Sequence, residues 1–134
     1  MQYLLILYTD EKGWNKLTPT EQEQGLAAYG AFFEALNKSG HYVGSNRLGL
    51  TSAARTVRIT DGKTKVLDGP YADTKEQLGG YFLIDVPDME AALSWAARCP
   101  SAASMASAMA ASRTARMLCI ASEFFMRNSR GSMP

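Results

Sequence analysis

Two side chains of this sequence could exchange protons with a substrate. Asp68 begins the segment Asp68-Gly69-Pro70, and His41 is the one histidine of the chain. An aspartate before Gly-Pro is typical of a turn in which the carboxylate accepts backbone hydrogen bonds, but the same carboxylate can act as a general base or ligand anchor. The simpler interpretation of His41 is a capping or solvent-exposed residue, although an imidazole can titrate near neutral pH. The catalytic hypothesis pairs His41 with Asp68 across adjacent strands, as acid and base.

Four further side chains could hold a ligand. Arg47 can bind a carboxylate through two parallel hydrogen bonds, and Tyr71 offers an aromatic wall with a hydroxyl donor. Lys75 and Glu76 are either solvated surface residues or part of the same polar group. We predict that these side chains and the acid–base pair converge on a polar pocket at a dimer seam, because pockets favour interfaces.

The segment around Lys75 and Glu76 carries two local signals. Thr74 and Gln77 have the spacing of a capping box, which predicts one local helical turn. The pair Gly79-Gly80 permits close approach of a backbone or a ligand. We therefore interpret this segment as a turn that also lines the pocket.

The composition excludes several classes of function. The chain has 134 residues, enough for one domain, and 46% of them are hydrophobic. With 14 basic and 13 acidic residues the formal charge is +1, so no nucleic-acid or anionic-membrane partner is expected. Cys99 and Cys119 lack metal-ligand spacing, and no phosphate loop or nucleophile elbow occurs, so we expect no metal and no cofactor. The apolar run near the N-terminus is too short to cross a bilayer, and we expect a cytoplasmic protein.

The first half of the chain predicts a strand, a helix and a weak strand. Residues 3–8 (YLLILY) are typical of a buried strand. Thr18, Pro19 and Glu21 form a helix start, and Gly40 is expected to end that helix in a left-handed conformation. The helix should turn one apolar stripe to the core, namely Leu26, Tyr29, Phe32, Phe33 and Leu36. Residues 41–50 are interrupted by glycine, which favours an edge strand or a bulge.

The following residues predict a hairpin, a buried strand and a second helix. Asp61-Gly62 lies between the runs TVRIT and KTKVL, a strong hairpin signal. The run GGYFLIDV is typical of another buried strand. Asp88 should cap a helix that continues through Ala97, with Met89, Ala92, Leu93 and Ala96 on its core face.

These elements predict an α+β fold. Strands with two helices on one face indicate a ferredoxin-like antiparallel sheet. The opposite face would expose apolar side chains from residues 3–8 and from GGYFLIDV. We therefore expect a homodimer that packs sheet against sheet.

One long stretch resembles a known family. The sequence LDGPYADTKEQLGGYFLIDV, residues 67–86, resembles the signature of the DGPF branch of the YCII-related proteins, usually written Asp-Gly-Pro-Phe-Ala-Glu-Thr-Lys-Glu. The segments MQYLLILY, SGHYVGSNRL and WAARCP match as well, so the resemblance covers roughly residues 2–100. Tyr71 stands where the signature has Phe, and Asp73 where it has Glu.

The resemblance implies a ferredoxin-like dimeric α+β barrel, and it implies no settled activity. DGPF proteins are often encoded beside extracytoplasmic-function sigma factors, which implies a regulatory alternative to catalysis. The wider YCII group has a proposed active-site histidine on its first helix, and this chain has Tyr29 at about that place. A histidine-based mechanism therefore does not transfer to this chain.

The C-terminal part departs from the family pattern. Family members typically end with a strand resembling Gly-x-Val-Glu-Val-Arg-Pro, whereas residues 101–112 are rich in Ala, Ser and Met. We predict that residues 101–112 extend or follow the second helix, and that residues 116–121 (RMLCIA) pair with a sheet edge in their own subunit or in a partner. The codons of residues 111–116 can encode Val-Glu-Asp-Arg-Pro in the neighbouring frame, and we hypothesise a frameshift in the gene. We accordingly divide the chain into a family domain, residues 1–100, and an atypical tail of the same domain, residues 101–134.

Two functions follow from these residues. The first is a cofactor-independent enzyme, of lyase or isomerase type, acting on a small organic substrate. The second is a small-ligand-binding or regulatory module. A purely structural dimer is a third hypothesis, which leaves the polar residues unexplained.

Overall fold

A computed structural model describes residues 1–71, 74–102 and 116–122 of the chain. Its elements follow one another in the order β1 (Gln2–Thr9), α1 (Glu11–Trp14), α2 (Pro19–Lys38), β2 (Tyr42–Arg47), the 3-10 turn η1 (Thr51–Ala53), β3 (Arg55–Thr60), β4 (Lys63–Asp68), β5 (Gln77–Asp85), α3 (Met89–Arg98) and β6 (Arg116–Ser122).

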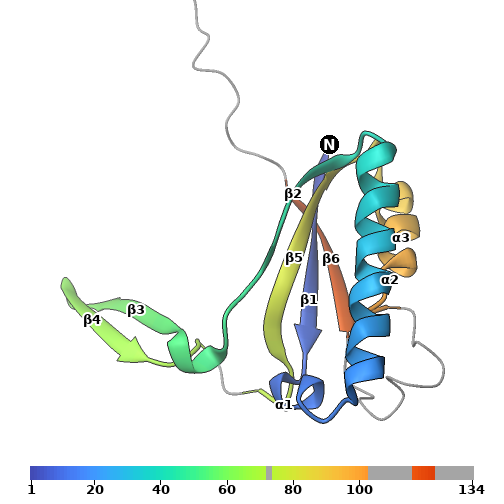
Figure 1. The fold of residues 1–134 in the computed structure, drawn as a ribbon. Coiled ribbons are helices and arrows are strands. Elements are labelled where there is room, and N and C mark those ends of the chain that lie inside the picture. Colours follow the sequence, from blue (N-terminus) through green and yellow to red (C-terminus); the bar gives the residue numbers. More distant parts are fainter. Residues whose placement is uncertain (72–73, 103–115, 123–134) are drawn as a thin grey trace, which may run out of the picture.

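Four strands form one antiparallel sheet in the order β2-β5-β1-β6. Helices α2 and α3 lie side by side on one face of this sheet (Figure 1). The strand order and the two helices are those of a ferredoxin-like α+β fold, as the sequence predicts. None of the described helices is long and apolar enough to span a bilayer.

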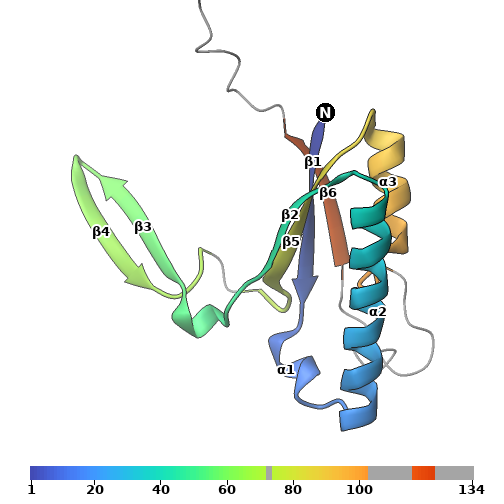
Figure 2. The same cartoon turned by 45° about the horizontal axis from the view of Figure 1, so that its top comes forward.

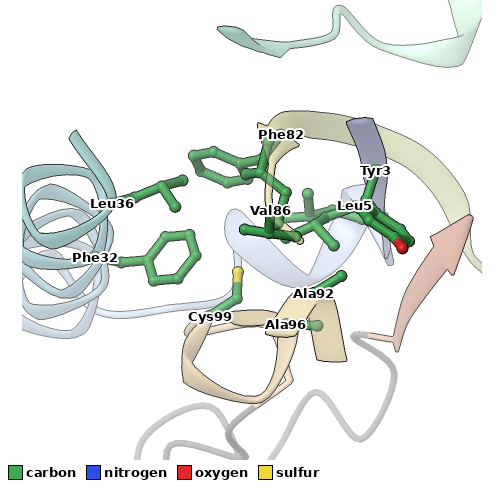
Figure 3. Close-up of a cluster of buried hydrophobic side chains, with 11 residues drawn as sticks. Tyr3, Leu5, Phe32, Leu36, Phe82, Val86, Ala92, Ala96 and Cys99 are labelled. Carbon is green, nitrogen blue, oxygen red and sulfur yellow. The ribbon is translucent and has the colours of Figure 1, made fainter. Parts of the chain in front are cut away.

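The core lies between the sheet and the helices. Along β1 buried and half-buried residues alternate, as expected for a strand with one covered face. Leu5 and Ile84 from the central strands are fully buried with Leu36 from α2. Figure 3 shows Phe32 pointing from α2 toward Phe82, and their ring centroids are 5.1 Å apart in an edge-to-face contact. Each fully buried large apolar side chain contributes about 1.5–3 kcal/mol through burial.

Helix α2 begins as the sequence predicts, but its apolar stripe is narrower. The Thr18 hydroxyl accepts a hydrogen bond from the Glu21 backbone, and Glu21 returns one to the Thr18 backbone, so the capping box is confirmed. Gly40 has φ +77°, which confirms the left-handed turn after the helix. Leu26 and Phe33 are 57% and 40% exposed, so their placement in the core was wrong.

Helix α3 turns small residues to the sheet. The Asp88 carboxylate caps it by accepting from the Ala91 backbone at 2.8 Å, which confirms the predicted start. Ala92 and Ala96 are buried. Met89 and Leu93, which the sequence also placed on the core face, are 39% and 53% exposed.

The predicted final strand is confirmed. β6 pairs antiparallel with β1 of its own chain, from Gln2 opposite Ser122 to Tyr8 opposite Arg116. Helix α3 ends at Arg98 and residues 99–102 form a turn, so α3 does not continue directly into the alanine-rich stretch. Residues 103–112, for which we predicted helix, lie outside the described residues.

Strands β3 and β4 form a sheet of their own. They are joined by Asp61 and Gly62, which have φ values of 51° and 71°, the geometry of a two-residue hairpin turn. The hairpin projects away from the four-stranded sheet, on the side opposite to α2 and α3 (Figures 1 and 2). The Asp-Gly signal predicts the turn, but it does not predict that β3 and β4 form a sheet separate from the other four strands.

Candidate functional site

Asp68 lies at the base of the β3–β4 hairpin. Its carboxylate oxygen Oδ1 is 3.0 Å from Nε of Arg55, and its side chain is 92% exposed. Gly69 follows with φ +95°, and its amide donates to the Ala54 carbonyl at 3.0 Å. Asp68 is thus held in a solvent-exposed ion pair, a kind of contact that contributes little to stability.

His41 directly precedes β2, at the edge of the four-stranded sheet. Its Nδ1 is 2.8 Å from the Asp85 carbonyl oxygen and therefore donates, because a carbonyl only accepts. The imidazole ring also contacts the edge of the Trp95 indole, with centroids 6.3 Å apart. The predicted pairing of His41 and Asp68 across adjacent strands is wrong, since β4 pairs with β3 and is no neighbour of β2. His41 instead links β5 to α3.

Three other candidate residues border the hairpin and the start of β5. Tyr71 is 82% exposed, and its ring lies 5.7 Å from the guanidinium carbon of Arg58. Lys75 is exposed and Glu76 is half-buried. Within the described residues, neither Tyr71 nor Lys75 forms a hydrogen bond, ion pair or ring contact with His41 or Arg47. The convergence of all the predicted side chains on one pocket at a dimer seam therefore stays a prediction.

The capping box at residues 74–77 does not start a helix. Gln77 begins strand β5 instead, and its side-chain amide donates to the Thr74 carbonyl at 2.6 Å. The Gln77 side-chain oxygen accepts from the Glu11 backbone at 3.2 Å, which attaches β5 to α1. Strand pairing with β1 outweighs the local preference for a helical turn.

Gly79 and Gly80 permit close contacts within the protein. A Cβ atom on Gly79 would lie 2.7 Å from the Thr9 hydroxyl, and one on Gly80 would lie 2.7 Å from the Asn46 carbonyl oxygen. The predicted close approach is therefore confirmed, but protein atoms occupy the space. These glycines have a structural role at the junction of β1, β2 and β5.

Arg47 lies at the end of β2, opposite Gly80 of β5. Its guanidinium carbon is 5.5 Å from the centroid of the Trp14 ring, a cation–π geometry. The Trp14 ring in turn contacts α2 at Gly25, where an added Cβ would lie 3.4 Å from the indole. Arg47 is exposed and has no ion-pair partner among the residues that the structure describes.

Tyr29 lies one helical turn after Gly25, so both residues are on the same side of α2. The Tyr29 hydroxyl is hydrogen-bonded to the hydroxyl of Ser101, a buried residue just after α3. Burial raises the pKa of Tyr29 to about 12, while the Ser101 hydrogen bond and the Arg47 charge act in the opposite direction. Tyr29 is consequently neutral at physiological pH and is within electrostatic range of Arg47.

Cys99 completes this group. It is fully buried, and burial raises the pKa of its thiol to about 11, with hydrogen bonds from Ser101 opposing that rise. A protonated, buried thiol is a poor nucleophile.

We call Trp14, Tyr29, Arg47, Cys99 and Ser101 the Arg47 cluster. It contains one cation, an aromatic surface and neutral hydrogen-bonding groups. The five residues of the cluster include neither a carboxylate nor an imidazole. The cluster can therefore attract an anion through the Arg47 guanidinium.

Sequence reasoning found only Arg47 of this cluster. Trp14 and Ser101 carried no signal by themselves, because their contacts arise from the fold. Tyr29 was placed in the apolar stripe of its helix, at about the position of the family's proposed histidine. Its partly buried position on α2 was the signal available.

None of the described residues forms a group of three or more metal ligands. The sequence profile of the YCII-related domain matches residues 1–114 of the chain. An uncharacterized protein of Rhizobium meliloti (strain 1021) is 36% identical over 96 residues, which cover 72% of this chain and 77% of that protein. On both grounds, the chain belongs to the YCII-related domain family.

Proposed function

We propose that the protein binds a small organic molecule bearing a carboxylate, with Arg47 as its anchor. The observation that carries the proposal is the exposed Arg47 guanidinium, which lies on Trp14 and has no carboxylate partner in the described part of the chain. An arginine can bind a carboxylate through two parallel hydrogen bonds. The indole beside it provides an apolar surface for the organic part of the ligand.

The neutral groups of the Arg47 cluster favour binding over proton abstraction. The raised pKa values of Tyr29 and Cys99 keep both groups protonated at neutral pH. A lyase or isomerase of the cofactor-independent kind needs a base near its substrate. We therefore propose a ligand-responsive module, of the kind that the resemblance to the DGPF branch implies, in preference to an enzyme.

We also propose that this module is a homodimer packed through the uncovered face of its sheet. Leu4, Ile6 and Leu83 alternate with core residues along the two central strands, so their side chains are on the face away from the helices. No described helix or strand lies on that face (Figures 1 and 2). An apolar face of this kind favours association with a second copy.

The ligand proposal can be tested by titration calorimetry with benzoate, succinate and 2-oxoglutarate as probes. We expect the wild-type protein to bind at least one of them. Arg47→Ala should weaken that binding about 10- to 100-fold, the value of a charge-assisted hydrogen bond or two. Arg47→Lys should recover part of the affinity, because it keeps the charge but not the planar fork.

A matched control is available in Arg98, whose guanidinium carbon lies 4.1 Å from the Trp95 ring centroid. Arg98→Ala removes a cation that lies over a different aromatic ring, that of Trp95, and it should leave the affinity for the probes unchanged. Binding that is equal in wild type and Arg47→Ala, or the absence of any binding, contradicts the proposal. An NMR spectrum of the bound probe after prolonged incubation separates the two functions, since conversion of the probe would indicate an enzyme.

A further inference from the structure

The β3–β4 hairpin, residues 55–68, is here called the arm. It pairs only with itself within the described part of the chain. An isolated two-stranded hairpin is marginally stable in water, and further packing is generally needed to hold it. The described residues of one chain therefore do not supply the packing that a hairpin of this kind requires.

One face of the arm carries an apolar group, next to the Arg55–Asp68 ion pair at its base. Val57 and Val66 are directly opposite each other, and Ile59 is two residues further along the same face. These three side chains are 62%, 63% and 74% exposed. The other face carries residues of mainly basic or polar character, namely Thr56, Arg58, Thr60, Lys63, Lys65 and Leu67. The arm is thus amphipathic, although no described residue covers its apolar face.

Specific hydrogen bonds hold the base of the arm. The Glu11 carboxylate accepts from the Thr51 amide at 2.6 Å and from the Thr51 hydroxyl at 2.9 Å. The Leu48 amide donates to the Gly79 carbonyl at 2.9 Å, which attaches the preceding segment to β5. These contacts connect the arm to α1 and β5 and direct it outward, so its position is built into the fold.

The arm projects on the same side as the uncovered face of the sheet (Figures 1 and 2). Leu4, Ile6 and Leu83 lie on that face, while the helices occupy the other. A second copy that packs on the uncovered face must therefore lie beside the arm. Two-fold symmetry would place the arm of each copy beside the other copy.

We propose that the arm clasps a second copy of this chain and buries Val57, Ile59 and Val66 against it. This inference rests on the homodimer proposed above and adds a second contact to its sheet interface. The partner is a second copy because the arm flanks the face on which that copy would lie. Each arm then gains packing that the described residues of its own chain do not supply.

The test compares Ile59→Lys with Thr60→Lys by sedimentation equilibrium of the full chain. Both substitutions add one positive charge to adjacent, exposed positions of β3, but they alter opposite faces of the arm. Ile59→Lys should raise the dissociation constant of the dimer at least about tenfold, because each dimer loses two buried apolar contacts. Thr60→Lys should leave it within about threefold of wild type.

A photoreactive benzoyl-phenylalanine at position 59 provides a second measurement. We expect it to give a covalent dimer, with the cross-link on the partner chain, whereas the same group at position 60 should give little. A wild-type dimer whose dissociation constant is unchanged by Ile59→Lys, with no cross-link from position 59, overturns the clasp but leaves the sheet-packed dimer intact. A wild-type protein that is monomeric overturns both. Neither result affects the binding of carboxylates by Arg47, which is measured separately.

Discussion

At the scale of single residues, the fold changes the ionisation of Tyr29. Burial raises its pKa to about 12, above the value of 10.0 expected in an unfolded chain. Below pH 10 the hydroxyl keeps its proton in both states, so this contribution to stability is fully present. Between pH 10 and 12 the unfolded chain releases the proton and the folded protein retains it, so stability falls as the pH rises.

Tyr29→Phe should therefore reduce the alkaline sensitivity of the protein. At neutral pH we expect the variant to lose about 1 kcal/mol, because the Ser101 hydroxyl loses its partner. Above pH 10 its free energy of unfolding should fall less steeply than that of wild type. Urea unfolding between pH 8 and 11 measures both effects.

Tyr71→Phe, at an exposed position, is the control, and its free energy of unfolding should vary with pH as that of wild type does. If the free energy of unfolding of Tyr29→Phe falls as steeply with pH as that of wild type, the prediction is wrong.

Individual residues also explain why the candidate site could be predicted only in part from the sequence. Arg47 was identified from its chemistry, which its residue type determines. Its location beside Trp14 and near Tyr29 depends on the pairing of Arg47 with Gly80, which is a contact between distant segments. The predicted pairing of Asp68 with His41 was wrong for a similar reason, since it assumed that they lie on adjacent strands.

At the scale of elements, local signals predicted most of the helices and strands. The capping residues Thr18 and Asp88 and the turn Asp61-Gly62 act within a few residues, and all three were correct. Helix orientation was less predictable. Phe32 and Phe33 are adjacent, so only one can point directly to the core, and α3 packs through alanines because they allow a close approach to the sheet.

Strand β6 was predicted from its apolar run alone, and its contribution to stability can be measured. Successive amides of a strand point to opposite sides, so prolines at both Leu118 and Cys119 must remove at least one amide that faces β1. We expect the double proline variant to lose about 1–3 kcal/mol of stability relative to a double glycine variant at the same positions, which keeps both amides. Chemical denaturation measures the difference. Equal stability of the two variants would mean that β6 does not pair with β1 in solution.

At the scale of the whole molecule, the described helices and strands leave one sheet face and one hairpin uncovered. Both lie on the side away from the helices, and both carry apolar side chains. The pattern of residues 3–8 predicted the apolar face, because alternate residues of a strand point to opposite sides. The position of the arm could not be predicted, because it is set by contacts of Glu11 and Gln77 with residues distant in sequence.

If this side is the dimer interface, the stability of the protein must depend on its concentration. Association stabilises the folded state by mass action, whereas the unfolding midpoint of a monomer is independent of concentration. We expect the urea midpoint to rise as the protein concentration is increased from about 1 to 100 μM, and light scattering to give twice the 14.6 kDa of one chain. Ile6→Lys, on the uncovered face, should lower the mass to that of one chain and remove the concentration dependence, because it places a charge in the centre of the interface. A stable wild-type monomer at micromolar concentration would contradict the dimer and require another partner for this face.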